Sequence, residues 1–318
     1  MNYTDLHCDT ALEIYLKNCS LLNNNLHIDI KRAELYNNYS QIFAVWSEND
    51  KSDDENYEQF FKVRDYFIER CAESDIILCE TARDYEENKH KRRAVLAVEG
   101  GKLLAGDINR LAVLRSHGVR FLTLVWNGLC DIGGAFNVSE GLTDFGREVV
   151  KECEKLGIII DLSHSSDKTV SDVFEITSKP VIATHSNSRS VFAHNRNLTD
   201  EQFCEIKRRG GVVGISLCSL HVGSERENLV NNNISEAYLD NPVYLKDVIR
   251  HIDYYMALGG ENCVCFGCDF DGAPLPDDIK SIADVAKIAE ELKKAGYDDN
   301  LIENIMYKNA NHFLVNNL

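Results

Sequence analysis

The sequence has no surplus of basic residues. It contains 34 Lys and Arg against 51 Asp and Glu, which gives a formal net charge of −17 over 318 residues. Proteins that bind nucleic acid or acidic membrane surfaces rely on clusters of Lys and Arg. The composition therefore argues against both partners and favours a small molecule.

Long apolar runs are also absent. The N-terminus, MNYTDLHCDTALEIYL, has no basic leader region, and no stretch approaches the ~20 apolar residues that a membrane span requires. The eleven cysteines are odd in number and lack the spacing of a small disulfide-bonded domain. We therefore predict a cytoplasmic protein with free thiols and no membrane association.

No repeat and no second linker-bounded unit interrupts the chain, so we predict a single domain over residues 1–318. Apolar runs alternate with segments of helical periodicity, which is typical of parallel strands covered by helices. The predicted helices lie near 30–36, 60–68, 103–117, 144–156, 167–177, 199–210, 243–258, 282–294 and 300–314. The predicted strands lie at 3–9, 41–47, 93–101, 119–127, at two places in 157–186, at 211–217 and at 263–269. Eight strands with intervening helices predict an α/β fold, a (β/α)8 TIM barrel, with 224–241 as an irregular rim loop.

Polar residues follow several of the predicted strands. His164 and His185 end the two strands in 157–186, Glu99 and Asp269 end two others, and His7 and Asp9 lie two residues apart, on one face of the first strand. In a barrel of this type the catalytic groups gather at the carboxyl ends of the strands. Each histidine alone could be a structural cap, and Glu99 could lie in water beyond its strand. The set as a whole favours a metal site.

These residues outnumber the ligands of one tetrahedral ion. Two ions ~3.5–4 Å apart, bridged by a carboxylate, would use the set. We assign Glu99 as the bridge, His7 and Asp9 to one ion, and His164 and His185 to the other. Imidazole and carboxylate ligands suit Zn²⁺, with Mn²⁺ or Co²⁺ left open.

The ordered motifs LHCD, VEGG, DLSH, ATHS and GCDFDG resemble the membrane dipeptidase (renal dipeptidase) family over essentially the whole chain. The resemblance implies a dinuclear zinc barrel that hydrolyses dipeptides, with the ligands at the five residues named above. It implies a proton-transfer role for Asp269, and it implies that Arg196 in AHNRNLT grips the substrate carboxylate. A homodimer and tolerance of a D-residue at the C-terminal position are also implied.

Trp126 departs from the family pattern. Mammalian members have a histidine at this position that helps to bind the carbonyl oxygen, whereas indole can donate one hydrogen bond but carries no charge. We therefore assign Trp126 only a role in lining the substrate pocket.

Other candidates are weaker. Cys265 and Cys268 have Cys-x-x-Cys spacing, but residues three apart in a strand face opposite ways, so we interpret both as buried hydrophobes. Asp271 competes with Asp269, but its neighbour Gly272 favours a role in a turn. His194 and His221 lie near the rim without an assigned role.

The leading hypothesis is a metallodipeptidase. A water bridging the two metals would lose a proton near neutral pH and attack the peptide carbonyl, and Asp269 would pass the proton to the leaving amine. Two alternatives stay open: a related amidohydrolase acting on a cyclic amide or lactone, and a catalytically silent metal-binding homologue.

Overall fold

The computed structural model describes residues 1–223 and 242–318. The segment 224–241, predicted as a rim loop, lies outside the described residues. The strands are β1 (Tyr3–Cys8), β2 (Tyr39–Trp46), β3 (Ile76–Leu78), β4 (Arg92–Glu99), β5 (Val119–Thr123), β6 (Ile159–Asp161), β7 (Val213–Ile215) and β8 (Val264–Phe266). All of the strand pairings are parallel.

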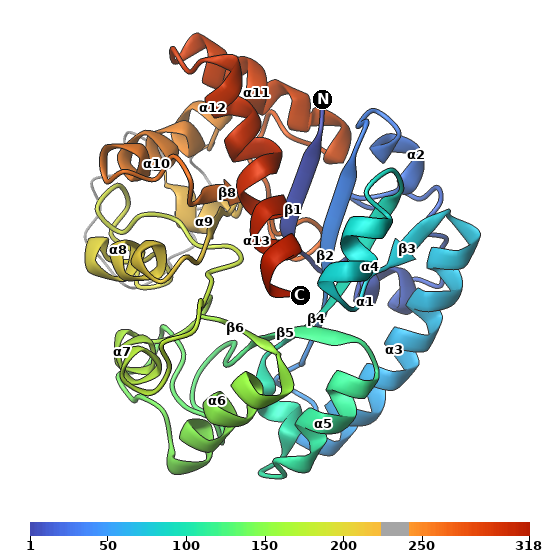
Figure 1. Ribbon diagram of the computed structural model, residues 1–318, viewed down its shortest axis with the longest axis vertical. Coiled ribbons are helices and arrows are strands. Elements are labelled where there is room, and N and C mark those ends of the chain that lie inside the picture. Colours follow the sequence, from blue (N-terminus) through green and yellow to red (C-terminus); the bar gives the residue numbers. More distant parts are fainter. Residues whose placement is uncertain (224–241) are drawn as a thin grey trace.

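Helices surround the strands (Figure 1). The α-helices are α1 (Thr10–Leu16), α2 (Ile30–Ala33), α3 (Asp53–Glu73), α4 (Ala82–Glu87), α5 (Asn109–Ser116), α6 (Asp144–Leu156), α7 (Asp167–Ile176), α8 (Asp200–Arg208), α9 (Ser219–Val222), α10 (Leu245–Ala257), α11 (Val285–Lys294), α12 (Asp299–Glu303) and α13 (Asn309–Asn317). The described residues also form two 3₁₀ turns, η1 (Gly101–Leu104) and η3 (Ile282–Asp284), and a π-helical turn, η4 (Asn304–Lys308).

The strands form a closed barrel. Hydrogen bonds join them in the order β6-β5-β4-β2-β1-β8-β7. The predicted strand before His185 closes the gap between β6 and β7 through single bridges, Asp161 to Ile182 and Ala183 to Val213. The predicted (β/α)8 fold is therefore confirmed, with β3 as an additional strand that pairs with the first part of β4.

Two apolar layers hold the barrel together. Alternate strand residues such as Leu6, Ile42 and Phe121 fill its interior, and their neighbours pack outward against the helices. Phe313 and Leu314 of α13 join the interior cluster. Helix α13 covers the amino ends of the strands, where Arg93 and Arg120 donate hydrogen bonds to it.

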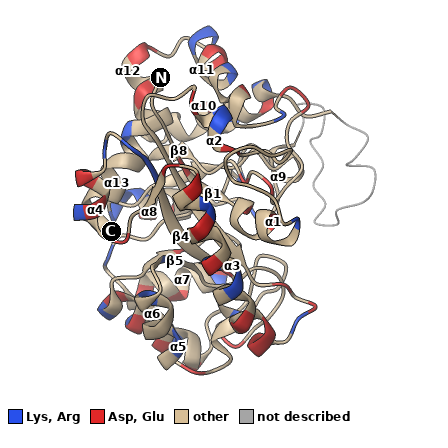
Figure 2. Cartoon of the chain, turned by 90° about the vertical axis from the view of Figure 1, so that its right-hand side faces the viewer, with Lys and Arg blue, Asp and Glu red and all other residues tan. Residues whose placement is uncertain are grey.

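Local signals place the helices as the sequence predicts. Thr199 and Gln202 form a reciprocal capping box at the start of α8. Gly157 ends α6 with φ of 68°, a left-handed conformation that glycine adopts without strain. On the outer helices, Lys and Arg are interspersed with Asp and Glu (Figure 2).

Candidate active site

The polar residues predicted at the strand ends converge on one point. Three overlapping groups of side chains have potential ligand atoms within 4.8 Å of one another. They are His7, Asp9 and Glu99; Glu99, His164 and His185; and His7, His185 and Asp269. The first two groups coincide with the two ligand sets predicted from the sequence.

The first pair reaches the site in an unexpected way. The pairing of β1 with β2 shifts register between Asp5 and Cys8, and β1 ends at Cys8. Asp9 lies beyond the strand, at the N-cap position of α1. The prediction that His7 and Asp9 share one face of a regular strand is therefore wrong. The register shift in β1 and the start of α1 position the two side chains instead.

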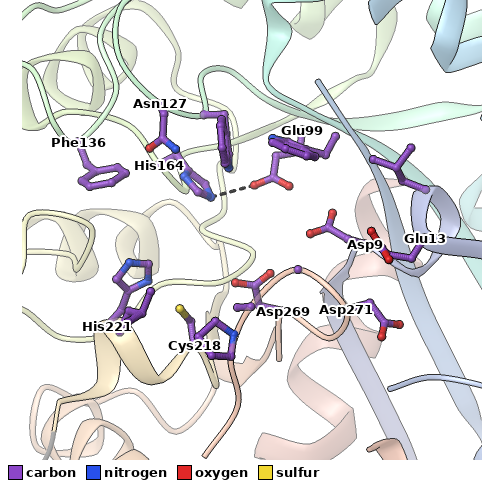
Figure 3. A pocket seen from close by; sticks show the side chains of 17 residues that line it. Asp9, Glu13, Glu99, Asn127, Phe136, His164, Cys218, His221, Asp269 and Asp271 are labelled. Carbon is purple, nitrogen blue, oxygen red and sulfur yellow. Dashed lines mark ion pairs between the residues drawn. The ribbon is translucent and has the colours of Figure 1, made fainter. Parts of the chain in front are cut away.

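Glu99 lies between the histidines. It is the last residue of β4, with 2% of its surface exposed. Its Oε2 lies 3.3 Å from Nε2 of His7, and its Oε1 lies 2.8 Å from Nε2 of His164 and 3.6 Å from Nε2 of His185. Each carboxylate oxygen thus faces a different part of the cluster, and the ion pair of Glu99 with His164 is drawn in Figure 3.

A buried hydrogen-bond chain orients His185. Its Nδ1 lies 2.8 Å from Oγ1 of Thr184, and that hydroxyl donates to Oδ2 of Asp161 at 2.6 Å. Because the Thr184 hydroxyl donates to Asp161, it accepts from Nδ1, which leaves Nε2 of His185 as a lone-pair donor toward the centre. Hydrogen-bonded carboxylates behind ligand histidines are usual at metal sites.

Two potential ligand atoms at the centre lack a hydrogen-bond partner. Nε2 of His7 and Oδ1 of Asp9 are buried without a hydrogen bond. Buried polar groups normally have partners, so atoms like these indicate that another group completes the site. Three imidazoles and three carboxylates around one space therefore fit a metal centre.

Asp269 and Asp271 differ in their surroundings. Oδ1 of Asp269 lies 3.8 Å from Nε2 of His7. Asp271 instead accepts from the Thr10 hydroxyl and from the backbone N–H of His27, both at 2.6 Å. Hydrogen bonds to Thr10 and His27 thus hold Asp271 in place, whereas Asp269 lies beside the cluster.

Burial and neighbouring charges shift the pKa values in the cluster. Burial opposes ionisation of Glu99, but His7 and His164 hold its pKa well below the usual range. Burial would lower the pKa of His7, yet the Glu99 charge and nearby carboxylates raise it to about 10. Burial raises the pKa of Asp269 to about 6, with His7 opposing and Glu99 adding to the shift. The carboxylates therefore concentrate negative charge in a small space, which favours the binding of a cation.

Four residues of the cluster, Asp9, Glu99, His164 and Asp269, line a cavity of about 340 Å³. The lining comprises Asp9, Leu12, Glu13, Trp46, Glu99, Trp126, Asn127, Phe136, His164, Cys218, Leu220, His221, Asp269, Asp271, Gly272, Ala273 and Pro274. Figure 3 shows Asp9 and Glu13 on one side of this space and Phe136 and His221 on the other. The cavity is large enough to hold a small molecule against the metal ligands.

Comparison with known proteins gives the family. The model of the membrane dipeptidase family, peptidase family M19, matches residues 1–315. The chain belongs to this family. An uncharacterized protein in the pqqA 5′ region of Klebsiella pneumoniae is 31% identical over 242 residues, which are 73% of this chain and 85% of that protein. Dipeptidase 3 of Mus musculus is 30% identical over 243 residues, 72% of this chain, and the match spans only 45% of the mouse protein.

Solved structures show the same fold. A metallo peptidase from Rhodobacter sphaeroides, liganded with a phosphinate mimic of the dipeptide L-Ala-D-Ala, has a TM-score of 0.87 and 23% identity. The similarity covers 100% of this chain and 99% of that one. Family membership confirms a metal-dependent hydrolase of the dipeptidase type. No helix among residues 1–223 and 242–318 is long and apolar enough to cross a membrane.

Trp126 lies in the cavity wall. Its ring packs edge-on against Trp46, with centroids 4.6 Å apart. Trp46 was not predicted as a site residue, although it directly precedes Ser47, the last residue of the second predicted strand. Nε1 of Trp46 is buried without a hydrogen-bond partner.

Arg196 is buried and is not among the residues that line the cavity. It is 3% exposed, and its Nη1 donates to Oγ of Ser186 at 2.8 Å, whereas Nε and Nη2 have no partner. His194 accepts a hydrogen bond from its backbone N–H, and His221 lines the cavity nearby. In the sequence, the feature that relates His221 to the site is its position shortly after the predicted strand at 211–217.

Proposed function

We propose that this protein is a dinuclear zinc dipeptidase. The observation that supports two ions is the position of Glu99, whose two oxygens face two separate donor groups. His7 and Asp9 would hold one ion, His164 and His185 the other, and Glu99 both. Nitrogen and carboxylate donors suit zinc, and Mn²⁺ or Co²⁺ would bind the same set. When bound, the ions would supply an activated water and a polarised carbonyl.

Asp269 would move the proton. Its carboxylate lies 3.8 Å from Nε2 of His7 and lines the cavity where the scissile bond would lie. Burial raises its pKa to about 6, which suits a group that takes up a proton and returns it near neutral pH. Asp271 is engaged by Thr10 and His27, which supports the choice of Asp269.

Charge would orient the substrate. The carboxylates of Asp9 and Asp269 would attract the ammonium group of a dipeptide. Arg196 has unpartnered buried donors, and a substrate carboxylate would satisfy them. Trp126 would line the pocket. Recognition of both termini is what would restrict the enzyme to dipeptides.

Further features of the proposal come from the family resemblance. They are tolerance of a D-residue at the C-terminal position and a homodimer. The composition of the sequence adds a single domain and a cytoplasmic location without a nucleic-acid or membrane partner to the proposal.

The test is turnover by purified, zinc-loaded protein. We expect hydrolysis of L-Ala-L-Ala and of L-Ala-D-Ala, and no hydrolysis of a cyclic amide or a lactone. Turnover of the cyclic substrates alone would favour the amidohydrolase alternative. Metal binding without turnover of any substrate would favour the silent homologue.

A further inference from the structure

The two sides of the cavity differ in chemistry. Asp9 and Glu13 lie on one side, and Phe136, Cys218 and His221 lie on the other (Figure 3). A dipeptide held as proposed above would place its ammonium end toward Asp9 and its carboxylate end toward His221. Its amino-terminal side chain would then lie along α1.

The wall beside α1 is apolar with a carboxylate next to it. Leu12 of α1 forms the apolar part, and Glu13 of α1 adds the carboxylate. Leu12 is 1% exposed, whereas the Glu13 side chain is 25% exposed. An apolar stem with a cationic end matches such a wall, which is the character of Lys and Arg side chains.

A cation already occupies the Glu13 carboxylate. Nζ of Lys17 lies 2.6 Å from Oε2 of Glu13, one helical turn along α1, and the Lys17 side chain is 57% exposed. Exposed pairs at this spacing contribute little stability and re-form readily. The Lys17 ammonium therefore shows where a substrate cation would bind and would be displaced by one held from inside the cavity.

The other carboxylates on this side of the cavity already have hydrogen-bond partners or a proposed role. Asp271 accepts hydrogen bonds from Thr10 and from His27, and Asp9 is a candidate metal ligand that also faces the ammonium group of the substrate in the proposed orientation. Glu13 is therefore the acidic group of this side that is available to a side chain of the substrate.

We propose that Glu13 is a specificity-determining residue that selects dipeptides with a basic amino-terminal residue. The proposal rests on the dipeptidase function, because the proposed binding of the two charged ends of a dipeptide determines how the substrate is oriented in the cavity. A partly exposed ion pair is worth roughly a fivefold change in rate or affinity.

The test compares Lys-Ala with norleucine-Ala, which has a stem of similar length without the charge. We expect wild-type kcat/KM to favour Lys-Ala by about fivefold, and Glu13→Gln to bring the ratio near one. Lys17→Met removes the competing ammonium and should keep or increase the preference. Glu87→Gln is the matched control, because Glu87 forms an exposed pair with Arg83 on α4, away from the cavity.

Equal rates for the two dipeptides in the wild type, or a preference that survives in Glu13→Gln, would overturn the proposal. Calorimetric binding of the same two dipeptides gives a readout that does not need turnover. If no dipeptide is hydrolysed, the proposed function fails. Tighter binding of Lys-Ala that is lost in Glu13→Gln would still support the role of Glu13, and equal binding would exclude it.

Discussion

Three residues that line the cavity have left-handed backbones. His164, Asp269 and Asp271 have φ values of 67°, 64° and 69°, a region that residues other than glycine rarely adopt. Such conformations cost about 1–3 kcal/mol each and persist where the surrounding structure enforces them. At His164 and Asp269 they turn an imidazole and a carboxylate toward the same space just after β6 and β8.

Asp269→Asn tests the proton-transfer role. The amide keeps the size of the side chain but cannot take up a proton near neutral pH, so we expect turnover to fall by ~10²–10⁴-fold. Metal content, measured by elemental analysis, should stay at the wild-type level. Near-normal rates in this variant, with Asp271→Asn inactive, would mean that Asp271 is the catalytic aspartate.

Gly272 makes room for the carboxylates. A Cβ atom at this position would lie 1.9 Å from Oδ2 of Asp9 and 2.6 Å from Oδ1 of Asp269. Gly272→Ala should therefore displace both groups and lower metal affinity or turnover by about 10–100-fold, as changes behind metal ligands do. Gly210→Ala is the control, because its Cβ would meet nothing within 4 Å and only its left-handed backbone is strained. Equal metal affinity in the two variants would show that Gly272 has no special role.

Arg196→Ala tests recognition of the substrate carboxylate. Loss of one partner of a buried charge pair costs roughly 2–5 kcal/mol, so kcat/KM for a free dipeptide should fall by ~30-fold or more. A C-terminally amidated dipeptide lacks that carboxylate, and the variant should lose much less activity toward it. If both substrates slow equally, another group sets the length of the substrate.

At the scale of the elements, α13 closes the amino ends of the strands. Phe313 is 2% exposed and packs with the barrel interior. Phe313→Ala should lower the free energy of unfolding by about 3–5 kcal/mol, measured by urea denaturation. His312→Ala, on the exposed side of α13, should change it by less than about 0.5 kcal/mol. A small effect of Phe313→Ala would mean that the barrel interior is stable without this helix.

The sequence was informative about elements with strong periodicity. Continuous apolar runs identified the barrel strands, and the capping pair Thr199 and Gln202 gave the start of α8. It did not predict β3, because a run of three apolar residues, Ile76–Leu78, is too short to distinguish from a loop. It also did not predict α1, whose start at Thr10 follows directly on β1.

The sequence located the candidate ligands better than the walls of the cavity. His7, Glu99, His164 and His185 stand at strand ends, where the topology of a barrel brings them together. Glu13 lies on a short helix and His221 at a helix after β7, and no periodic pattern relates either to the cavity. Such contacts depend on how loops and helices pack over the rim, which spacing in sequence does not give.

For the whole molecule, the metal ions would stabilise a crowded set of charges. Asp9, Glu99 and Asp269 are held close together in a chain of net charge −17. Any ligand that binds only the folded state stabilises it, by about 2.7 kcal/mol when free metal exceeds Kd a hundredfold. EDTA should therefore lower the melting temperature and zinc should restore it. Glu99→Gln should weaken this response, because both ions lose a ligand.

The number of ions is a separate measurement. Elemental analysis of gently purified protein should give two equivalents per chain, because each oxygen of Glu99 faces its own donor group. A reproducible single equivalent that zinc supplementation does not change would remove the bridging role of Glu99.

The pairing of Trp46 with Trp126 has an optical consequence. The chain contains two tryptophans, and both line the cavity beside Glu99. Near-ultraviolet excitation selective for indole therefore produces emission from this one place in the molecule. Paramagnetic Mn²⁺ or Co²⁺ would quench that emission on binding and Zn²⁺ would not. The fluorescence of the unlabelled protein should therefore report which kind of ion is bound. It should also change when a ligand fills the cavity.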